Sequence, residues 1–333
     1  MAVSMRDVAA AASVSVGTVS NVLNSPEKVS PTTVARVHSA IERLGFVRND
    51  AARQLRAGRS RCVGLVVLDV GNPFFTAVAR AAEQRAAEHD LTVLLGTSDD
   101  DTGRERAYLD TFDELRVFGL MVSPVGDDLS RLRTLHARGV PVVLVDRDGR
   151  GTPFSSVAVD DVAGGRLAVR HLCETGRRRI AFVGGPRGLR QVTDRLRGAQ
   201  DAIDEFDGAS LEVVDATAMT VLAGRVAGER LRERDLDERP DAVFCANDLL
   251  AMGVLQALTM LGGVAVPDDI ALIGYDDIDF ARSTVVPLSS VRQPSDSIGA
   301  SAIDLLVATV EAREREPEHV LYQPTLVARE STG

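Results

Sequence analysis

Polar side chains that directly follow short apolar runs are the residues of this chain with the clearest chemistry. The runs have the length of buried strands, and parallel sheets bind their ligands at the carboxyl ends of strands. Carboxylate, guanidinium and amide groups form paired hydrogen bonds with sugar hydroxyls, and a phenylalanine ring offers a flat apolar face. The clusters are Asp69 with Asn72, Phe74 and Phe75, then Asp146 with Arg147, Asp160 with Asp161, Asn247 with Asp248, and Asp276 with Asp277. Five clusters on five strand ends predict one polar ligand cleft.

Helix capping is the alternative role for these residue types, because aspartate and asparagine also begin the helices that follow strands. For Asp160, Asp161 and Asp248, capping explains the sequence at least as well as ligand contact does.

Motifs for catalysis or cofactor binding are missing from the sequence. The first apolar run is followed by DVGNPFF rather than by the GxGxxG of dinucleotide-binding proteins. The GGPRG segment at 184–188 is only a partial phosphate-loop pattern, and no GxSxG nucleophile motif occurs. The five histidines lack the spacing of metal ligands. We therefore expect no catalytic residue, no metal and no cofactor.

The segment RDVAAAASVSVGTVSNVLN at residues 6–24 predicts two short helices joined by a tight turn. Ser15 can cap the second helix, which is expected over about residues 16–23. The residues left facing outward are Val16, Gly17, Thr18, Ser20 and Asn21, a surface without an acid that suits approach to a DNA major groove. A third helix from Pro31 to Leu44 completes a helix-turn-helix headpiece. An ordinary helical hairpin is the alternative for the first two helices alone.

Charge is distributed unevenly along the 333 residues. The formal net charge is −10, yet residues 1–61 contain nine Arg or Lys against four Asp or Glu. A basic segment on an acidic body is typical of a nucleic-acid-binding module attached to a sensor. The three cysteines, Cys62, Cys173 and Cys245, lack paired spacing, and neither a signal peptide nor a spanning segment is recognisable. These features indicate reduced thiols and a cytoplasmic protein without membrane contact.

From residue 62 onward, short apolar runs alternate with helical stretches. The predicted strands are Val63–Leu68, Thr92–Leu95, Gly119–Val122, Val140–Val145, Arg179–Val183, Leu211–Val214, Ala242–Cys245, Ile270–Ile273, Leu288–Val291 and Val320–Val327. This alternation predicts parallel doubly wound sheets with helices on both faces, and the number of strands favours two lobes. The break between the lobes is expected near the Gly-, Pro- and Ser-rich stretch 147–156.

The order and spacing of several motifs resemble the lactose-repressor (LacI/GalR) family of bacterial transcription regulators. The motifs are residues 6–24, VS at 29–30, LGFVRNDAARQLRAGRS at 44–60, VGLVV at 63–67, NPFF at 72–75, VDR at 145–147, VDD at 159–161, RLRG at 195–198, AND at 246–248, GYDD at 274–277 and RQP at 292–294. The resemblance covers nearly the whole chain. It implies an all-α helix-turn-helix headpiece plus an α/β, two-lobed, periplasmic-binding-protein-like effector domain. That domain has parallel doubly wound sheets, a hinged cleft and three crossings between the lobes.

The resemblance also implies domain boundaries. The headpiece is expected at 1–47, a hinge helix or linker at 48–61, and the effector-binding and dimerisation domain at 62–333. Within that domain we expect lobe 1 at about 62–158 and 294–319, and lobe 2 at about 159–291 and 320–330.

The implied effector cleft takes residues from both lobes. Positions that match the family's cleft are Phe74, Asp146, Arg147, Arg195, Asn247, Asp276 and Gln293, and the strand-end pattern adds Asn72 and Phe75. Arg195 lies on an expected helix, so its alternative role is to pair with acids on the surface. Many sugar-binding members carry an aromatic residue near the position of Ala216–Ala218, where this chain has only small residues and no tryptophan. The identity of the sugar, whether it is phosphorylated, and whether the effector is a sugar at all therefore stay open.

The implied DNA contacts fall into three groups. Val16, Gly17 and Asn21 match positions that face base edges, and Ser4, Ser15, Thr18 and Asn24 match positions that contact phosphates. Residues 49–57, including Asn49 and Ala52, match a hinge helix that orders on DNA, and Leu55 matches the residue wedged into the minor groove. Arg48 stands where the family often has proline.

Together these features predict a sequence-specific DNA-binding repressor. Its partners are expected to be a near-palindromic operator, a second copy of the chain in a dimer or tetramer, and a small-molecule effector, a sugar or sugar derivative. One alternative is an extracytoplasmic solute-binding protein, which the missing signal peptide and the basic headpiece disfavour. The other is a Rossmann-like enzyme acting on a sugar, which the missing catalytic motifs disfavour.

Overall fold

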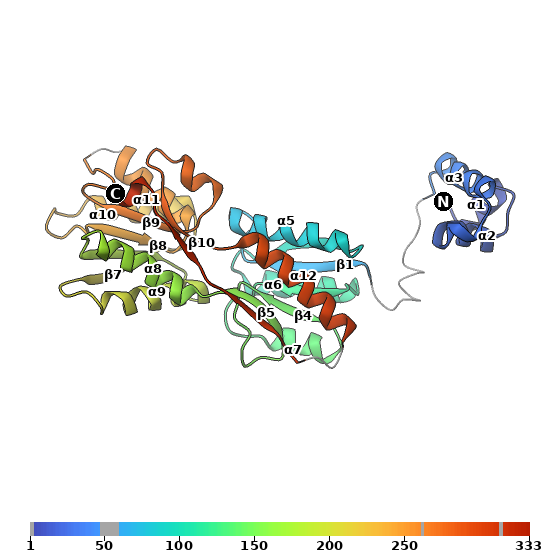
Figure 1. Ribbon diagram of the computed structural model, residues 1–333, viewed down its shortest axis with the longest axis horizontal. Coiled ribbons are helices and arrows are strands. Elements are labelled where there is room, and N and C mark those ends of the chain that lie inside the picture. The colour runs from blue at the N-terminus through green and yellow to red at the C-terminus, as the bar shows by residue number, and fades with distance from the viewer. Residues whose placement is uncertain (1–2, 47–59, 261–262, 313–315) are drawn as a thin grey trace. The chain divides into compact units, whose positions relative to one another are not determined.

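The computed structural model of the chain describes residues 3–46, 60–260, 263–312 and 316–333. The chain forms two compact units, Met1–Arg59, here called the headpiece, and Ser60–Gly333, here called the body (Figure 1).

The headpiece has the three predicted helices, α1 (Met5–Ala11), α2 (Val16–Asn24) and α3 (Pro31–Leu44), with a short 3-10 turn η1 (Pro26–Lys28). Val8, Val19 and Val37, one from each helix, are completely buried and form the centre of its core. Ser15 caps α2 as expected, because its side chain accepts a hydrogen bond from the Thr18 amide. Gly45 ends α3 in the left-handed conformation, with φ 61°.

The body contains two six-stranded sheets, each formed by one lobe. Sheet A of lobe 1 has the order β11-β5-β4-β3-β1-β2 and consists of β1 (Cys62–Val67), β2 (Thr92–Thr97), β3 (Gly119–Val122), β4 (Val142–Val145), β5 (Ser155–Val159) and β11 (His319–Tyr322). Sheet B of lobe 2 has the order β12-β10-β9-β8-β6-β7 and consists of β6 (Arg179–Gly184), β7 (Ser210–Asp215), β8 (Ala242–Cys245), β9 (Ala271–Asp276), β10 (Ser289–Arg292) and β12 (Thr325–Val327). All neighbouring strands are parallel except β10 and β12.

The two sheets share one winding scheme. In each sheet the first strand lies between the second and the third, so the strand order reverses at β1 in sheet A and at β6 in sheet B. Loops that leave adjacent strands toward opposite faces open a crevice at such a reversal. The central strands β1, β3, β4, β6, β8 and β9 are almost entirely buried, as parallel strands covered on both faces must be.

Eight helices of the described body cover the sheets. They are α5 (Pro73–Glu88), α6 (Thr102–Glu114), α7 (Ser130–Ala137), α8 (Asp161–Glu174), α9 (Arg190–Ile203), α10 (Val221–Arg232), α11 (Asp248–Met260) and α12 (Ser295–Glu311), with 3-10 turns η2 (Asp279–Ser283) and η3 (Glu330–Thr332). Helix α12 packs on α5 and on strands β3, β4 and β5, so this late segment of the chain belongs to lobe 1 (Figure 1).

The chain crosses between the lobes three times. The crossings join β5 to α8, β10 to α12 and β11 to β12. The expected break at 147–156 is wrong, because β5 still pairs with β4 in sheet A and the first crossing follows Val159. Phe154 in that stretch is buried in the lobe 1 core, so the Gly- and Pro-rich composition marks only a loop inside the lobe.

The final predicted strand, Val320–Val327, is two strands in different sheets. Residues His319–Tyr322 pair with β5 in lobe 1, and Thr325–Val327 pair with β10 in lobe 2. The expected assignment of residues from 320 onward to lobe 2 is therefore wrong for 320–322. Pro324 stands between the two strands and has no amide hydrogen to continue a ladder, which suits the crossing placed there.

Helices α8 and α9 approach each other closely enough to need glycine on both. A Cβ atom on Gly198 of α9 would lie 1.9 Å from the Val162 carbonyl oxygen, and one on Gly165 of α8 would lie 2.0 Å from the Arg195 carbonyl oxygen. Because the obstructing atoms are backbone, side-chain rotation cannot relieve either contact. This packing fixes where α9, and therefore Arg195, lies over sheet B.

We expect Gly198→Ala to lower the free energy of unfolding by about 1–3 kcal/mol, because the added methyl group must push α8 and α9 apart. Urea unfolding followed by circular dichroism measures this. Gly188→Ala is the matched control, since a Cβ there meets nothing within 4 Å. Equal stability of the two variants would show that the close crossing is not needed.

Candidate functional site

A cavity of about 320 Å³ lies between the lobes, at the carboxyl ends of strands of both sheets. Lobe 1 lines it with Leu68, Asp69, Asn72, Phe74, Phe75, Asp99, Asp100 and Asp146. Lobe 2 lines it with Leu189, Gln191, Val192, Arg195, Ala218, Met219, Thr220, Asn247 and Asp276. Its volume lies at the lower end of the range of about 300–1,000 Å³ for small-molecule sites.

Arg195 is the cation in the cavity wall. Its Nε donates to Asp161 Oδ1 at 2.8 Å, and its Nη1 donates to the Ala246 carbonyl at 2.7 Å and lies 3.9 Å from Asp276 Oδ1. The guanidinium stacks on the Tyr275 ring, 3.7 Å from the centroid. With 3% of its surface exposed, Arg195 cannot take the alternative role of surface pairing.

Asp276 connects the two lobes at the end of β9. Its Oδ2 accepts a hydrogen bond from Asn72 Nδ2 of lobe 1 at 3.0 Å, and its Oδ1 accepts one from Gln293 Nε2 at 2.7 Å. Asn72 also caps α5, because its Oδ1 accepts from the Phe74 amide at 3.0 Å. One asparagine therefore fixes both the start of α5 and the position of a carboxylate in the opposite lobe.

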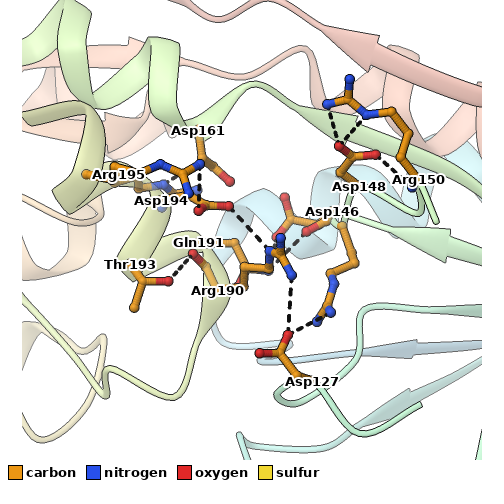
Figure 2. Close-up of polar contacts among 12 residues, drawn as sticks. Asp127, Asp146, Asp148, Arg150, Asp161, Arg190, Gln191, Thr193, Asp194 and Arg195 are labelled. Carbon is orange, nitrogen blue, oxygen red and sulfur yellow. Dashed lines mark hydrogen bonds and ion pairs between the residues drawn. The ribbon is translucent and has the colours of Figure 1, made fainter. Parts of the chain in front are cut away.

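Asp146 makes the reciprocal connection from the end of β4. Its Oδ2 accepts from Gln191 Nε2 of α9 at 2.7 Å, and its backbone carbonyl accepts from the same amide at 3.1 Å (Figure 2). Its other oxygen, Oδ1, is buried and has no hydrogen-bond partner among the described residues. A buried acceptor left open in a cavity wall is suited to a ligand that brings a donor.

Electrostatics in this wall are dominated by acids. Asp146, Asp161 and Asp276 lie close to the one guanidinium of Arg195 and close enough to interact with one another. Burial, with smaller contributions from Asp161 and Asp276, raises the pKa of Asp146 to about 8, although Arg195 and Gln191 oppose the rise. Burial also raises the pKa values of Asp161 and Asp276, with Arg195 opposing.

Two of the residues expected in the cleft do not line the cavity. The Arg147 guanidinium instead donates to the Gly126 carbonyl at 2.6 Å and to Asp127 at 2.7 Å. These partners lie in the loop after β3 and hold the guanidinium within lobe 1. Gln293 lies behind Asp276 and positions that carboxylate.

The other expected cleft residues lie at the cavity. Phe74 and Phe75 pack edge to face, with ring centroids 5.0 Å apart. Asn247 donates to the Met219 carbonyl at 3.0 Å and accepts from the Leu250 amide at 2.9 Å. Both groups of its amide are therefore engaged within lobe 2.

Asp160, Asp161 and Asp248, for which helix capping was the alternative, have different partners in the structure. Asp160 caps α8 by accepting from the Ala163 amide at 2.9 Å. Asp161 pairs with Arg195, and Asp248 accepts from the Ile278 amide at 2.8 Å and from Ser290 Oγ at 2.7 Å. Capping is thus confirmed for Asp160 alone.

Sequence reasoning missed several cavity residues. Gln191 precedes Arg195 by four residues on α9, so helical spacing places both on one face and could have indicated it. Asp99 and Asp100 follow β2, and the strand-end rule applied to that strand would have found them. Leu189, Val192, Met219 and Thr220 carry no comparable signal.

The headpiece presents the expected surface along α2. Val16, Gly17 and Asn21 are exposed, and Thr18 and Ser20 are half-buried. Ser4 caps α1 in a reciprocal pair with Asp7, and the Asn24 side chain donates to the Ser20 carbonyl at 2.8 Å. Asn49, Ala52 and Leu55 lie outside the described residues.

A helix-turn-helix headpiece followed by a two-lobed body with a ligand cavity defines the class of ligand-responsive bacterial transcription regulators. Residues 4–49 match the family model of bacterial regulatory proteins of the lacI family, and residues 169–332 match that of the periplasmic binding protein-like domain. The chain belongs to the LacI family and is a DNA-binding transcriptional regulator with an effector-binding domain.

Similar proteins extend over the whole chain. The transcriptional repressor PurR of Escherichia coli O139:H28 is 31% identical over 99% of this chain and 96% of its own. The structure of the regulator CelR in complex with cellobiose matches with a TM-score of 0.73 and 31% identity, over 99% of both chains. The Lac repressor dimer bound to operator and to the anti-inducer ONPF matches with a TM-score of 0.85 and 25% identity, over 100% of this chain and 99% of that one.

Among the residues that the structure describes, no helix is long and apolar enough to span a bilayer. Nor do three or more His, Cys, Asp or Glu side chains gather there in a way that could hold a metal ion.

We expect Asp146→Asn to raise the melting temperature at pH 8, and to raise it less at pH 5. The folded-state pKa of about 8 lies above the ordinary value of 3.8, so wild-type stability falls as the pH rises between these values. The asparagine side chain does not ionise, so the variant lacks this fall in the free energy of unfolding, which is at most about 1.4 kcal/mol per pH unit. Thermal unfolding across pH 5–8 measures it.

Asp148→Asn is the control, because the pKa of Asp148 is lowered by its bonds with Arg150 and it stays ionised over this range. Its melting difference from wild type should not change between pH 5 and 8. An Asp146→Asn protein that melts no higher than wild type at pH 8 would contradict the buried-acid interpretation.

Proposed function

We propose that this protein is a homodimeric repressor whose affinity for a near-palindromic operator changes when a sugar or sugar derivative binds between the lobes. The observation that carries the proposal is the cavity itself. Its polar side chains come from both lobes, and two amides, Asn72 and Gln191, already bond across it. A ligand that replaces or extends these bonds changes the angle between the lobes.

The chemistry of the wall supports a hydroxyl-rich ligand. Asp146 Oδ1 is buried without a hydrogen-bond partner among the described residues, and Phe74 and Phe75 give the same cavity apolar lining. Sugars combine hydroxyl donors with an apolar ring face, so they satisfy both features. CelR was solved with cellobiose, and a LacI-family regulator of Enterococcus faecium with ribose.

The DNA contacts of the proposal come from α2 and the segment after α3. Val16 and Asn21 would contact base edges, and Gly17 lets the backbone approach the groove. Ser4, Ser15, Thr18 and Asn24 would contact phosphates. The first turns of α1 and α2 also carry the amide groups that favour anions. Asn49, Ala52 and Leu55 would act from the hinge helix in the minor groove.

The proposed mechanism is a coupled equilibrium between two lobe angles. A ligand shifts this equilibrium only by its difference in affinity for the two states. Because the hinge segments of a dimer lie next to the first strand of each body in sequence, a change in lobe angle alters the distance and register at which they meet DNA.

We expect selection from random duplex DNA to yield near-palindromes with half-sites about one helical turn apart, because a dimer carries one α2 per copy. Affinity for them should fall steeply with salt, since Arg48, Arg53, Arg56 and Arg59 follow α3 closely in sequence. Sequencing of the bound pool and a salt titration measure both. Selected sites without two-fold symmetry would contradict the proposal.

We expect Leu55→Ala to weaken operator binding by about ten- to a hundredfold and to leave ligand binding unchanged, because truncation removes the proposed minor-groove wedge. Leu55→Met, which keeps an apolar side chain of similar volume, is the control and should bind nearly as wild type. Fluorescence anisotropy with the selected operator measures affinity. Wild-type affinity in Leu55→Ala would exclude the wedge.

A further inference from the structure

The cavity between the lobes has far more acid than base in its wall. Among the described residues, five aspartates line it, Asp69, Asp99, Asp100, Asp146 and Asp276, against one arginine, Arg195. Arg195 is already engaged by Asp161, a further acid directly behind the wall. Of the five, Asp99 has its own cation, because it pairs with Arg104 of α6. The described wall therefore lacks positive charge for its remaining carboxylates.

The acids at the lobe 1 end form a separate group at the ends of β1 and β2. Asp69 Oδ1 accepts from the Gly71 amide at 2.7 Å, and Asp99 accepts from Thr97 Oγ1 at 2.9 Å. In the described part of the chain no hydrogen bond or ion pair reaches the Asp100 carboxylate. Burial, Asp69 and Asp99 together raise the pKa of Asp100 to about 6.

A second observation points to a ligand in the same cavity. Asp146 is 5% exposed, and its Oδ1 lies in the wall without a hydrogen-bond partner among the described residues. The charged groups that act on it are Asp161, Arg195 and Asp276, so only one of the three is positive. A buried carboxylate in such surroundings either keeps a proton or takes a donor from the ligand.

We infer that the ligand of this cleft carries a protonated amine and no anionic group, as in an amino-substituted sugar or polyol. Its ammonium group lies among Asp69, Asp99 and Asp100, and a hydroxyl donates to Asp146 Oδ1. Phe74 and Phe75 line the same cavity, and aromatic rings attract cations. A phosphate or carboxylate on the ligand would meet Asp69 and Asp100 at this end, where the nearby cation, Arg104, is already paired with Asp99. The inference rests on the proposed function and specifies the chemical class of its effector.

Proton release follows from this arrangement. Below pH 6 Asp100 holds a proton and offers less charge to an ammonium group. Affinity for an amine therefore rises as the pH increases from 5 to 7. At pH 6, binding releases a proton from the fraction of molecules in which Asp100 is protonated. A neutral sugar does not favour the ionised form of Asp100, so its binding releases no proton from this residue.

The test compares ligands that differ only in charge. Full-length protein is titrated calorimetrically with D-glucose, D-glucosamine and D-glucose 6-phosphate, and with the corresponding galactose and mannose sets. For at least one set we expect the amine to bind about tenfold or more tightly than its parent sugar, and the phosphate to bind more weakly than the parent. The enthalpy of amine binding at pH 6 should depend on the ionisation enthalpy of the buffer, as proton release requires.

Asp100→Asn should reduce the preference for the amine to within about threefold of the parent sugar. Asp101→Asn is the matched control, because Asp101 is the exposed cap of α6, asparagine also caps, and it lies outside the cavity wall. Asp69→Asn serves as a second variant. Melting curves establish that each variant is folded.

The inference is overturned if amine and parent bind equally, if the phosphate binds most tightly, or if no amine binds. A neutral or phosphorylated sugar that binds at least as tightly as the amine and shifts operator affinity would overturn the charge preference alone. An amine that binds with the expected preference but leaves operator affinity unchanged would instead overturn the proposed function.

Discussion

The buried guanidinium of Arg195 is the interaction on which the rest of the body depends. It is held between Asp161 and the Ala246 carbonyl and stacks on Tyr275, so it joins α8, α9, β8 and β9 at the edge of the cavity. Three carboxylates share this one cation. Loss of the guanidinium from such a cluster typically costs about 3–5 kcal/mol, because the carboxylates then stay buried without a compensating charge. The close packing of α8 on α9 through Gly165 and Gly198 keeps the guanidinium in place.

Around this cluster the lobes meet through amides rather than through ion pairs alone. Asn72 of lobe 1 donates to Asp276 of lobe 2, and Gln191 of lobe 2 donates to Asp146 of lobe 1. Asp127 adds a weaker bridge, because it accepts from Arg147 in its own lobe and from Arg190 across the cleft at 3.4 Å (Figure 2). Neutral donors suit this role, since they can be exchanged for ligand hydroxyls without leaving a buried charge.

The sequence predicted what local rules determine. Helix caps, strand positions and the polar residues at strand ends depend on neighbours a few residues apart, and Ser15, Asp160 and Asn72 lie where those rules placed them. Arg147 departs because its guanidinium bonds with Gly126 and Asp127, about 20 residues earlier in the chain, and no local rule indicates such partners. The bond from Asn72 to Asp276 spans 204 residues, and no pattern along one chain indicates such a pair. Composition placed the lobe boundary inside lobe 1, because glycine and proline mark loops whether or not a lobe ends there.

The three crossings restrict how the lobes can move. Two of them leave from β5 and β11, which are neighbours in sheet A, and the third leaves from β10, the neighbour of β12 in sheet B. Three adjacent connectors resist twisting and separation of the lobes. Hinge bending about the connectors is then the motion of lowest energy cost. Ligand binding in the cavity is therefore converted into one motion, the bending of one lobe relative to the other. A cut in any single connector would leave two to hold the lobes together while removing that restriction.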